Sequence, residues 1–177
     1  MRFNDIEQFP HSHYRVSVDL DDVEAVLNRY DRPDMGSPLI LNPEWQRGHV
    51  WSQEQKTAFI EYFLKGGTTG REIYFNCSSW GTDYNTPTYC VDGLQRLTAA
   101  MEFVKNEFKA FGHYYGEFDG SPRMIRNSFS FNVLCVRNKR DLLKVYIDFN
   151  SGGTPHNPSE IERIKKMLEE TSVEEVL

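Results

Sequence analysis

The segment from Tyr89 to Ala100 (YCVDGLQRLTAA) brings together side chains that could bind a phosphate. An apolar run of strand type leads into an Asp-Gly turn, and a helical pattern begins directly after Gly93. The N-terminus of a helix presents unpaired backbone N–H groups and a partial positive charge, which suits an anion. Gly93 allows the backbone to approach a ligand closely or to adopt a positive φ. Arg96 lies in the first helical turn, where its guanidinium could bind two phosphate oxygens at once.

Two interpretations of this segment are open from its residues alone. In the functional one, Asp92 holds a divalent metal ion or accepts a proton, and Gln95 orients a water molecule or reads a base. In the structural one, Asp92 caps the helix and Arg96 forms a surface salt bridge. An Asp-Gly turn ahead of a helix is common, so the local pattern by itself favours the structural interpretation.

A second segment, Asn42 to Trp51 (NPEWQRGHVW), places polar side chains between two tryptophans. Indole and guanidinium faces can stack on bases, and Arg47 could reach a phosphate. Trp51 is expected to anchor the loop on the core. Gln46 and Arg47 could equally well bind a ligand or pair within the protein, because polar loop residues serve both purposes.

Other candidates carry less information. Asn150, in the segment DFNSGG, could orient a ligand, although a helix C-cap made by Asn and Gly explains most of that pattern. His11 and His13 have no Cys or His partner close in sequence, so isolated surface histidines are favoured over a metal site. The three cysteines lack zinc spacing, and there is neither a Walker A motif nor a G-x-G-x-x-G motif. We therefore expect neither zinc nor an organic redox cofactor.

Apolar periodicity, caps and breakers predict the elements that would position these residues. A capping box of Ser52 and Gln55 marks the start of one helix, and Gly66-Gly67 marks its end. Residues 112–126 form a mobile-looking loop. The fold class expected is α+β. Strands are predicted at His13–Val18, Leu39–Leu41, Glu72–Asn76, Thr88–Val91 and Phe129–Val136, and helices at Asp19–Tyr30, Ser52–Lys65, Leu94–Phe111, Asp141–Phe149 and from Pro158 to about Glu170.

The length of 177 residues suits an N-terminal arm (1–12), a single domain (13–170) and a C-terminal tail (171–177). The net charge of −6 argues against coating nucleic acid by bulk charge, although residues 123–140 are locally basic. No apolar run approaches the roughly 20 residues that span a membrane, and the N-terminus lacks the pattern of a signal peptide. An odd number of widely spaced cysteines fits reduced thiols, so a cytoplasmic location is expected.

Taken in order, the motifs N-P-x-W-Q-R-G-x-V-W-S, V-D-G-x-Q-R-L-T-A and F-N-S-G-G, followed by S-E-I-E-R, resemble one family. The chain is similar, over roughly residues 39–166, to the domain of unknown function 262 family. That family is the DGQQR branch of the ParB/sulfiredoxin-like superfamily, found in restriction and phage-defence proteins and in phage genomes. The resemblance implies a compact ParB/sulfiredoxin-like fold, with a small mixed sheet flanked by helices.

The resemblance also implies a pocket where the Asp-Gly turn meets the Gln-Arg loop, linked in relatives to nucleotide hydrolysis or DNA cleavage. This chain departs from the family motif at Leu94, where the family has a Gln, and it looks like a stand-alone, phage-type member. Carried over by motif, the expected catalytic residues are Asp92, Gln95, Arg96 and Arg47. The expected phosphate-binding residues are Gln46, Arg47, Gly93, Gln95, Arg96 and Asn150.

Three functions are open at this point. The first is a Mg²⁺-dependent hydrolase of a nucleoside triphosphate or of DNA, with Asp92 as the metal ligand and a kinase less favoured. The second is a phage-encoded binding protein or regulator of a host protein, with a decayed pocket. Leu94 and the acidic net charge motivate this alternative. The third is DNA nicking without nucleotide hydrolysis. The oligomeric state does not follow from the sequence.

Overall fold

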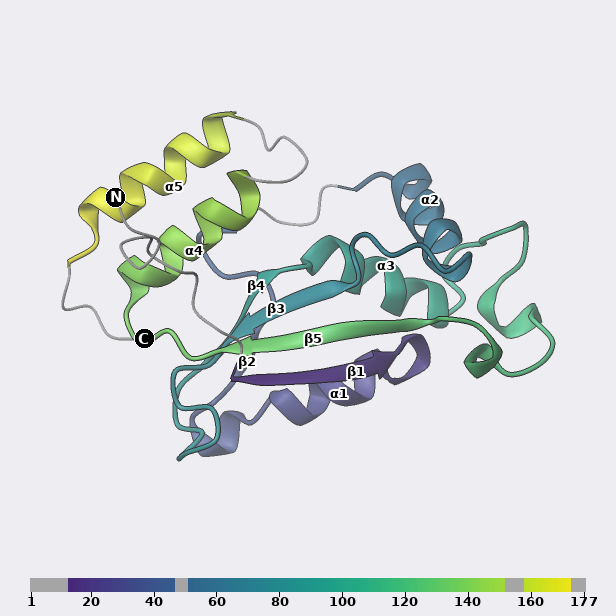
Figure 1. Ribbon diagram of the computed structural model, residues 1–177, viewed down its shortest axis with the longest axis horizontal. Coiled ribbons are helices and arrows are strands. Elements are labelled where there is room, and N and C mark those ends of the chain that lie inside the picture. Colours follow the sequence, from purple (N-terminus) through teal and green to yellow (C-terminus); the bar gives the residue numbers. More distant parts are fainter. Residues whose placement is uncertain (1–12, 47–50, 152–157, 173–177) are drawn as a thin grey trace, which may run out of the picture.

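The computed structural model describes residues 13–46, 51–151 and 158–172. Within these ranges a five-stranded mixed sheet is combined with helices, which confirms the predicted α+β class (Figure 1). The strands are β1 (Tyr14–Asp19), β2 (Leu39–Ile40), β3 (Glu72–Asn76), β4 (Thr88–Asp92) and β5 (Ser128–Leu134). The α-helices are α1 (Val23–Tyr30), α2 (Gln53–Leu64), α3 (Leu94–Val104), α4 (Lys139–Ser151) and α5 (Pro158–Glu170).

The strand order in the sheet is β1-β5-β3-β4-β2. β5 pairs antiparallel with β1 and parallel with β3, whereas β4 pairs antiparallel with β3 and parallel with β2. Consequently β5, the last of the described strands in the sequence, lies between β1 and β3 (Figure 1). The β4–α3 junction that the sequence singles out therefore lies next to β3, near the middle of the sheet.

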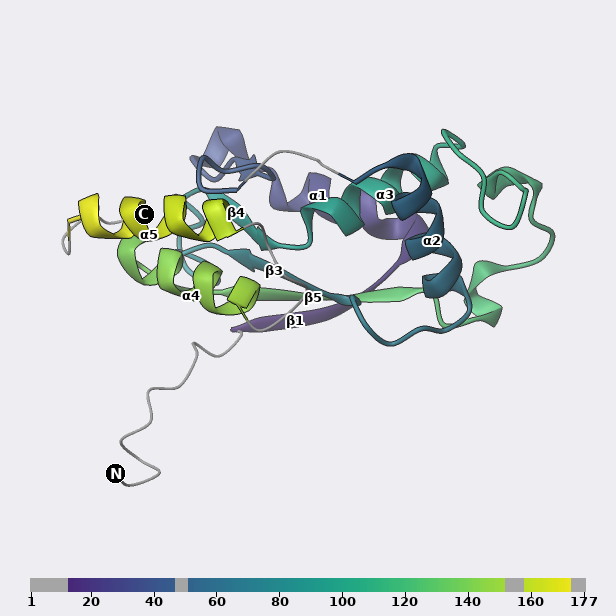
Figure 2. The same cartoon turned by 90° about the horizontal axis from the view of Figure 1, so that it is seen from above.

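Helices cover the two faces of the sheet unequally. α1, α2 and α3 lie along one face, and α4 with α5 covers only one end of the other (Figure 2). Each face has its own buried cluster, because successive strand residues point to opposite faces. The first core, on the α1–α3 side, includes Leu27, Phe63, Phe75, Leu97, Phe103 and Phe131. The second core, under α4 and α5, includes Trp45, Val91, Leu134, Leu142, Tyr146 and Ile164.

Local sequence accounts for the ends of most elements. Ser52 and Gln55 form the predicted capping box at the start of α2. α3, however, ends at Val104, and the prediction of a helix to Phe111 is wrong. Asn106 and Phe111 adopt positive φ values of 61° and 52°, which a continuing helix excludes. The chain turns back there because Phe108 packs against Phe103, with ring centroids 5.6 Å apart.

The loop between α3 and β5 contains two short 3₁₀ turns, Tyr115–Glu117 and Pro122–Met124. The predicted N-terminal arm lies outside the described residues. Among the helices of the described ranges, none combines the length and the apolar character needed to cross a bilayer.

Candidate functional site

The β4–α3 junction is a strand, one glycine and a helix. Asp92 ends β4, and Gly93 adopts φ +116° before α3 begins at Leu94. A β-carbon at Gly93 would lie 2.5 Å from Cδ1 of Ile73, well inside van der Waals contact. Glycine is therefore required here both for its backbone conformation and for packing on β3. No side chain caps α3, so Asp92 does not act as the helix cap that the structural interpretation assigns to it.

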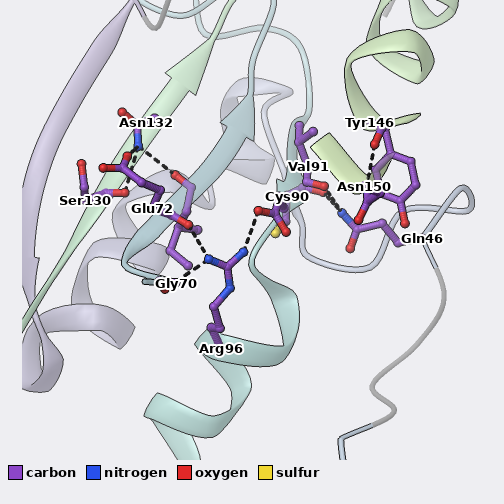
Figure 3. Close-up of polar contacts among 12 residues, drawn as sticks. Gln46, Gly70, Glu72, Cys90, Val91, Arg96, Ser130, Asn132, Tyr146 and Asn150 are labelled. Carbon is purple, nitrogen blue, oxygen red and sulfur yellow. Dashed lines mark hydrogen bonds and ion pairs between the residues drawn. The ribbon is translucent and has the colours of Figure 1, made fainter. Parts of the chain in front are cut away.

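Arg96 folds back from α3 onto the chain that enters β3 (Figure 3). Its Nη1 donates to the carbonyl oxygens of Gly70 and Glu72, at 3.1 Å and 2.7 Å. Its Nη2 donates to Asp92 Oδ2 at 2.6 Å, and the Arg96 side chain is only 16% exposed. The guanidinium thus holds the first turn of α3, the end of β4 and the start of β3 together.

Two glutamines bring the upstream loop to the same junction. Gln46 Nε2 donates to the carbonyls of Cys90 and Val91, at 2.5 Å and 2.8 Å (Figure 3). At the other end of the loop, the backbone N–H of Trp51 donates to Gln95 Oε1 at 3.0 Å. Residues 47–50 lie outside the described ranges, and Arg47 is among them. The residues that flank this segment are nevertheless anchored on β4 and on α3, on either side of Asp92-Gly93.

The two tryptophans of this loop pack into different cores, Trp51 against the first and Trp45 in the second. Trp51 is half-buried against the first core and lies 5.3 Å from Phe59 between ring centroids, as expected for an anchor. Trp45 is buried in the second core and packs against Tyr89, with centroids 5.0 Å apart. Trp45, at 3% exposed, presents no open face to a base.

Asn150 lies near the end of α4 and bonds within its own helix. Its Nδ2 donates to the carbonyl of Tyr146, one turn earlier, at 2.7 Å. Tyr146 and Val91 belong to the second core, so α4 packs against the strand that leads into Asp92. The role of Asn150 toward a ligand stays a prediction.

Burial sets the chemistry of the thiol beside the junction. Cys90 is fully buried, and the loss of hydration raises its pKa to about 12, with the nearby Asp92 charge acting in the same direction. A thiol with this pKa stays protonated at neutral pH, and therefore Cys90 is not a nucleophile. Its side chain packs in the first core.

Asp92 has one carboxylate oxygen that could meet a cation. Oδ2 pairs with Arg96, whereas Oδ1 has no hydrogen-bond partner within the described ranges, and the side chain is 35% exposed. Among the described residues, the one group of three ligand-type side chains close enough to share a metal ion is Asp19, Asp21 and Asp22 at the end of β1, and Asp92 is not part of it. Because Mg²⁺ commonly takes one or two carboxylates together with substrate phosphates, a single Asp92 carboxylate fits that ion.

Sequence reasoning missed a polar network that touches the junction from β3. Arg15 Nη2 donates to Glu72 Oε1 at 2.7 Å, and Asn132 Nδ2 donates to Glu72 Oε2 at 2.5 Å. The backbone carbonyl of the same Glu72 accepts from Arg96 (Figure 3). The alternating Ser-Phe-Ser-Phe-Asn of β5 marks one polar face of that strand, and it was the available signal.

These features define a small α+β domain whose polar residues converge on a strand–glycine–helix junction. Residues 23–132, from α1 into β5, match the family model of the GmrSD restriction endonuclease N-terminal domain. The chain belongs to this family, which relates it to nucleases of phage defence. No curated protein and no solved structure matches it significantly. The expected likeness to the domain of unknown function 262 family and to ParB-like proteins stays a prediction.

Proposed function

We propose that this domain binds a phosphate of a nucleotide or of DNA at the β4–α3 junction and hydrolyses it with Mg²⁺. The observation that carries the proposal is the anchoring of the two residues that flank 47–50: Gln46 bonds to β4, and the backbone N–H of Trp51 bonds to Gln95 on α3. Gln46 and Trp51 are thereby fixed on either side of Asp92 and Gly93, and Arg47 follows Gln46 directly in the sequence. Membership in a restriction endonuclease family supports an ester of phosphoric acid as the substrate.

The proposed roles follow from which polar atoms are already engaged. Arg96 is a positioning residue, because its guanidinium orients Asp92 and joins three backbone segments. Arg47 is the proposed phosphate ligand, because a guanidinium matches the geometry of phosphate oxygens. Asp92 would hold Mg²⁺ through Oδ1, and the ion would neutralise charge that develops on the phosphate. The first N–H groups of α3 add a partial positive charge beside it.

The test compares phosphate release and plasmid nicking in wild type, Asp92→Asn and Arg47→Ala, with each nucleoside triphosphate and with Mg²⁺. Asp92→Asn should lower turnover by about 100-fold or more, the scale of lost charge stabilisation in a transition state. Arg47→Ala should weaken nucleotide or DNA binding, whereas Arg29→Ala, at an exposed position on α1, should match wild type. Absence of any turnover in wild type, or full activity of Asp92→Asn, would reject the proposal.

A second function has its own supporting observation. Arg96, Gln46 and Gln95 all bond to backbone atoms, which is what a purely structural junction requires. In that case the domain is a binding module or regulator of a host protein, and the motif only maintains its fold. It predicts no turnover in wild type, together with a loss of stability in Arg96→Ala. Calorimetric unfolding of Arg96→Ala beside the activity assays separates the two functions.

A further inference from the structure

The sheet has an open polar face on the side opposite α1–α3. α4 and α5 cover only one end of this side, so the other end, over β1, β5 and the start of β3, has no helix on it (Figure 2). A groove of about 470 Å³ lies there, lined by three arginines, one glutamate and several hydroxyl groups. Its size is within the range of pockets that bind small ligands or a single nucleotide unit. The charged residues are Arg15, Arg71, Arg126 and Glu72.

Arg71 places a buried positive charge in the wall of this groove. The residue is 9% exposed, and its guanidinium donates to the backbone carbonyls of Phe63, Gly67, Arg126 and Ser128. Within the described ranges, no carboxylate is among its hydrogen-bond or ion-pair partners. Burial lowers the pKa of Arg71, and repulsion from the Arg126 guanidinium lowers it further. Arginine nevertheless stays protonated in proteins, so the charge persists and would be stabilised by an anion.

Arg126 provides a second cation that no internal partner neutralises. It is exposed, and its side chain has no hydrogen bond or ion pair with any other described residue. Arg15 differs, because Glu72 pairs with it at 2.7 Å. The groove therefore keeps the charges of Arg71 and Arg126 uncompensated, on a chain whose net charge is −6.

Two exposed apolar residues, Met124 and Ile125, form an apolar tip immediately ahead of Arg126, which lines the groove. Met124 is 85% exposed and Ile125 46% exposed, and they lie between Arg123 and Arg126 in the sequence. A 3₁₀ turn orders this tip, since the N–H of Met124 donates to the Ser121 carbonyl at 3.0 Å. Exposed Met and Ile flanked by arginines match the apolar wedges that proteins insert between base steps from the minor groove.

We propose that this face binds duplex DNA, with a backbone phosphate in the groove between Arg71 and Arg126 and with Met124 against a base step. The surface is distinct from the β4–α3 junction, although Glu72 contributes its side chain to one and its carbonyl to the other. The proposal depends on the proposed function only for the choice of DNA as the nucleic acid. Binding measured without Mg²⁺ keeps it separate from any hydrolysis.

The first experiment follows the anisotropy of a labelled DNA duplex over a series of salt concentrations. Arg126→Ala should weaken binding several-fold and should lower the slope of log affinity against log salt by about 1, as expected for one lost phosphate contact. Arg126→Glu should weaken it further. Arg29→Ala, an exposed arginine on α1, is the matched control and should bind as wild type. Wild-type affinity of Arg126→Glu, or equal weakening by Arg29→Ala, would overturn the proposal.

The second experiment tests the tip with a duplex that carries 2-aminopurine, whose emission rises when the base is unstacked. Met124→Ser should abolish the rise in emission while leaving the salt slope unchanged. Binding is measured in the wild type without Mg²⁺, so a failed hydrolysis assay leaves this result intact. An emission rise that persists in Met124→Ser overturns the wedge. Binding to anionic lipid vesicles in place of the duplex overturns the choice of partner.

Discussion

At the scale of single residues, Gly93 is constrained both in its backbone conformation and in the space around it. Its φ of +116° is strained for any residue with a β-carbon, and the space that a β-carbon would need is occupied by Ile73. The Asp-Gly turn was predicted from the sequence, where a positive φ at Gly93 was one of two reasons for a glycine. The contact with Ile73 was not, because it depends on how closely α3 approaches β3.

We predict that Gly93→Ala lowers the free energy of unfolding by about 2 to 4 kcal/mol, the sum of backbone strain and overpacking. Gly81→Ala is the matched control. Gly81 also has a positive φ, +77°, but no heavy atom lies within 4 Å of its added β-carbon. The control should lose only about 1 to 2 kcal/mol. Urea denaturation measures both, and equal losses would show that Ile73 moves aside.

Sequence spacing predicts some contacts of the Asp92–Arg96 motif and not others. The pairing of Asp92 with Arg96 follows from an i,i+4 relation across the start of a helix. The bonds from Arg96 to Gly70 and Glu72 connect residues more than 20 positions apart, and no local pattern encodes them. From the sequence, Arg96 was predicted to bind phosphate, because these distant partners could not be foreseen. In the structure its guanidinium bonds to Gly70, Glu72 and Asp92.

At the scale of elements, Arg71 joins the end of α2 to the start of β5. Its four acceptors come from Phe63 in α2, from Gly67 after it, and from Arg126 and Ser128. The guanidinium carbon also lies 4.0 Å from the centroid of the Phe63 ring. One side chain therefore satisfies carbonyls both from the end of α2 and from the chain that enters β5.

We expect Arg71→Met to lower the free energy of unfolding by about 3 kcal/mol or more. Methionine keeps the apolar stem but leaves buried carbonyls without donors, each of which is costly. Arg15→Met removes an ion pair whose side chains are 64% and 44% exposed, so it should cost less than about 1 kcal/mol. Thermal unfolding of the pair checks this ordering, and a larger loss for Arg15→Met would contradict it.

Most elements were predictable because each has a local signal. β3 was predicted with its observed bounds, and α2 and α5 followed from a capping residue or a proline at the first turn. α3 was predicted too long, since its apolar periodicity continues to Phe108 after the helix has ended. There the aromatic side chain reaches the same core from a loop, so periodicity alone cannot distinguish the two arrangements.

At the scale of the whole molecule, two buried clusters share one sheet. The family match covers residues 23–132, which hold most of the first core, whereas α4 and α5 follow it in sequence and build the second. Arg163 donates to the carbonyl of Trp45 at 2.9 Å, so α5 also fixes the residue next to Gln46. The second core therefore supports the upstream anchor of the candidate site.

Ile164→Ala should lower the free energy of unfolding by about 2 to 5 kcal/mol, because Ile164 is fully buried in the second core. Lys165→Ala, its exposed neighbour on α5, should change the free energy by no more than about 0.5 kcal/mol. Hydrogen exchange should show faster opening of α4 and α5 in Ile164→Ala, with α1 to α3 less affected. Uniform acceleration throughout would mean that the two clusters unfold as one unit.

The position of β5 between β1 and β3 has a consequence for biosynthesis. Tyr14 pairs with Val133, so β1 has no strand to pair with in the sheet until β5 has been made. Glu72 in β3 likewise has no partner on that edge until Ser130 of β5 has been made. During translation both strands keep an unpaired edge, the kind of surface that invites aggregation. The sheet can close only late, and we expect nascent chains that stop before β5 to depend on chaperones.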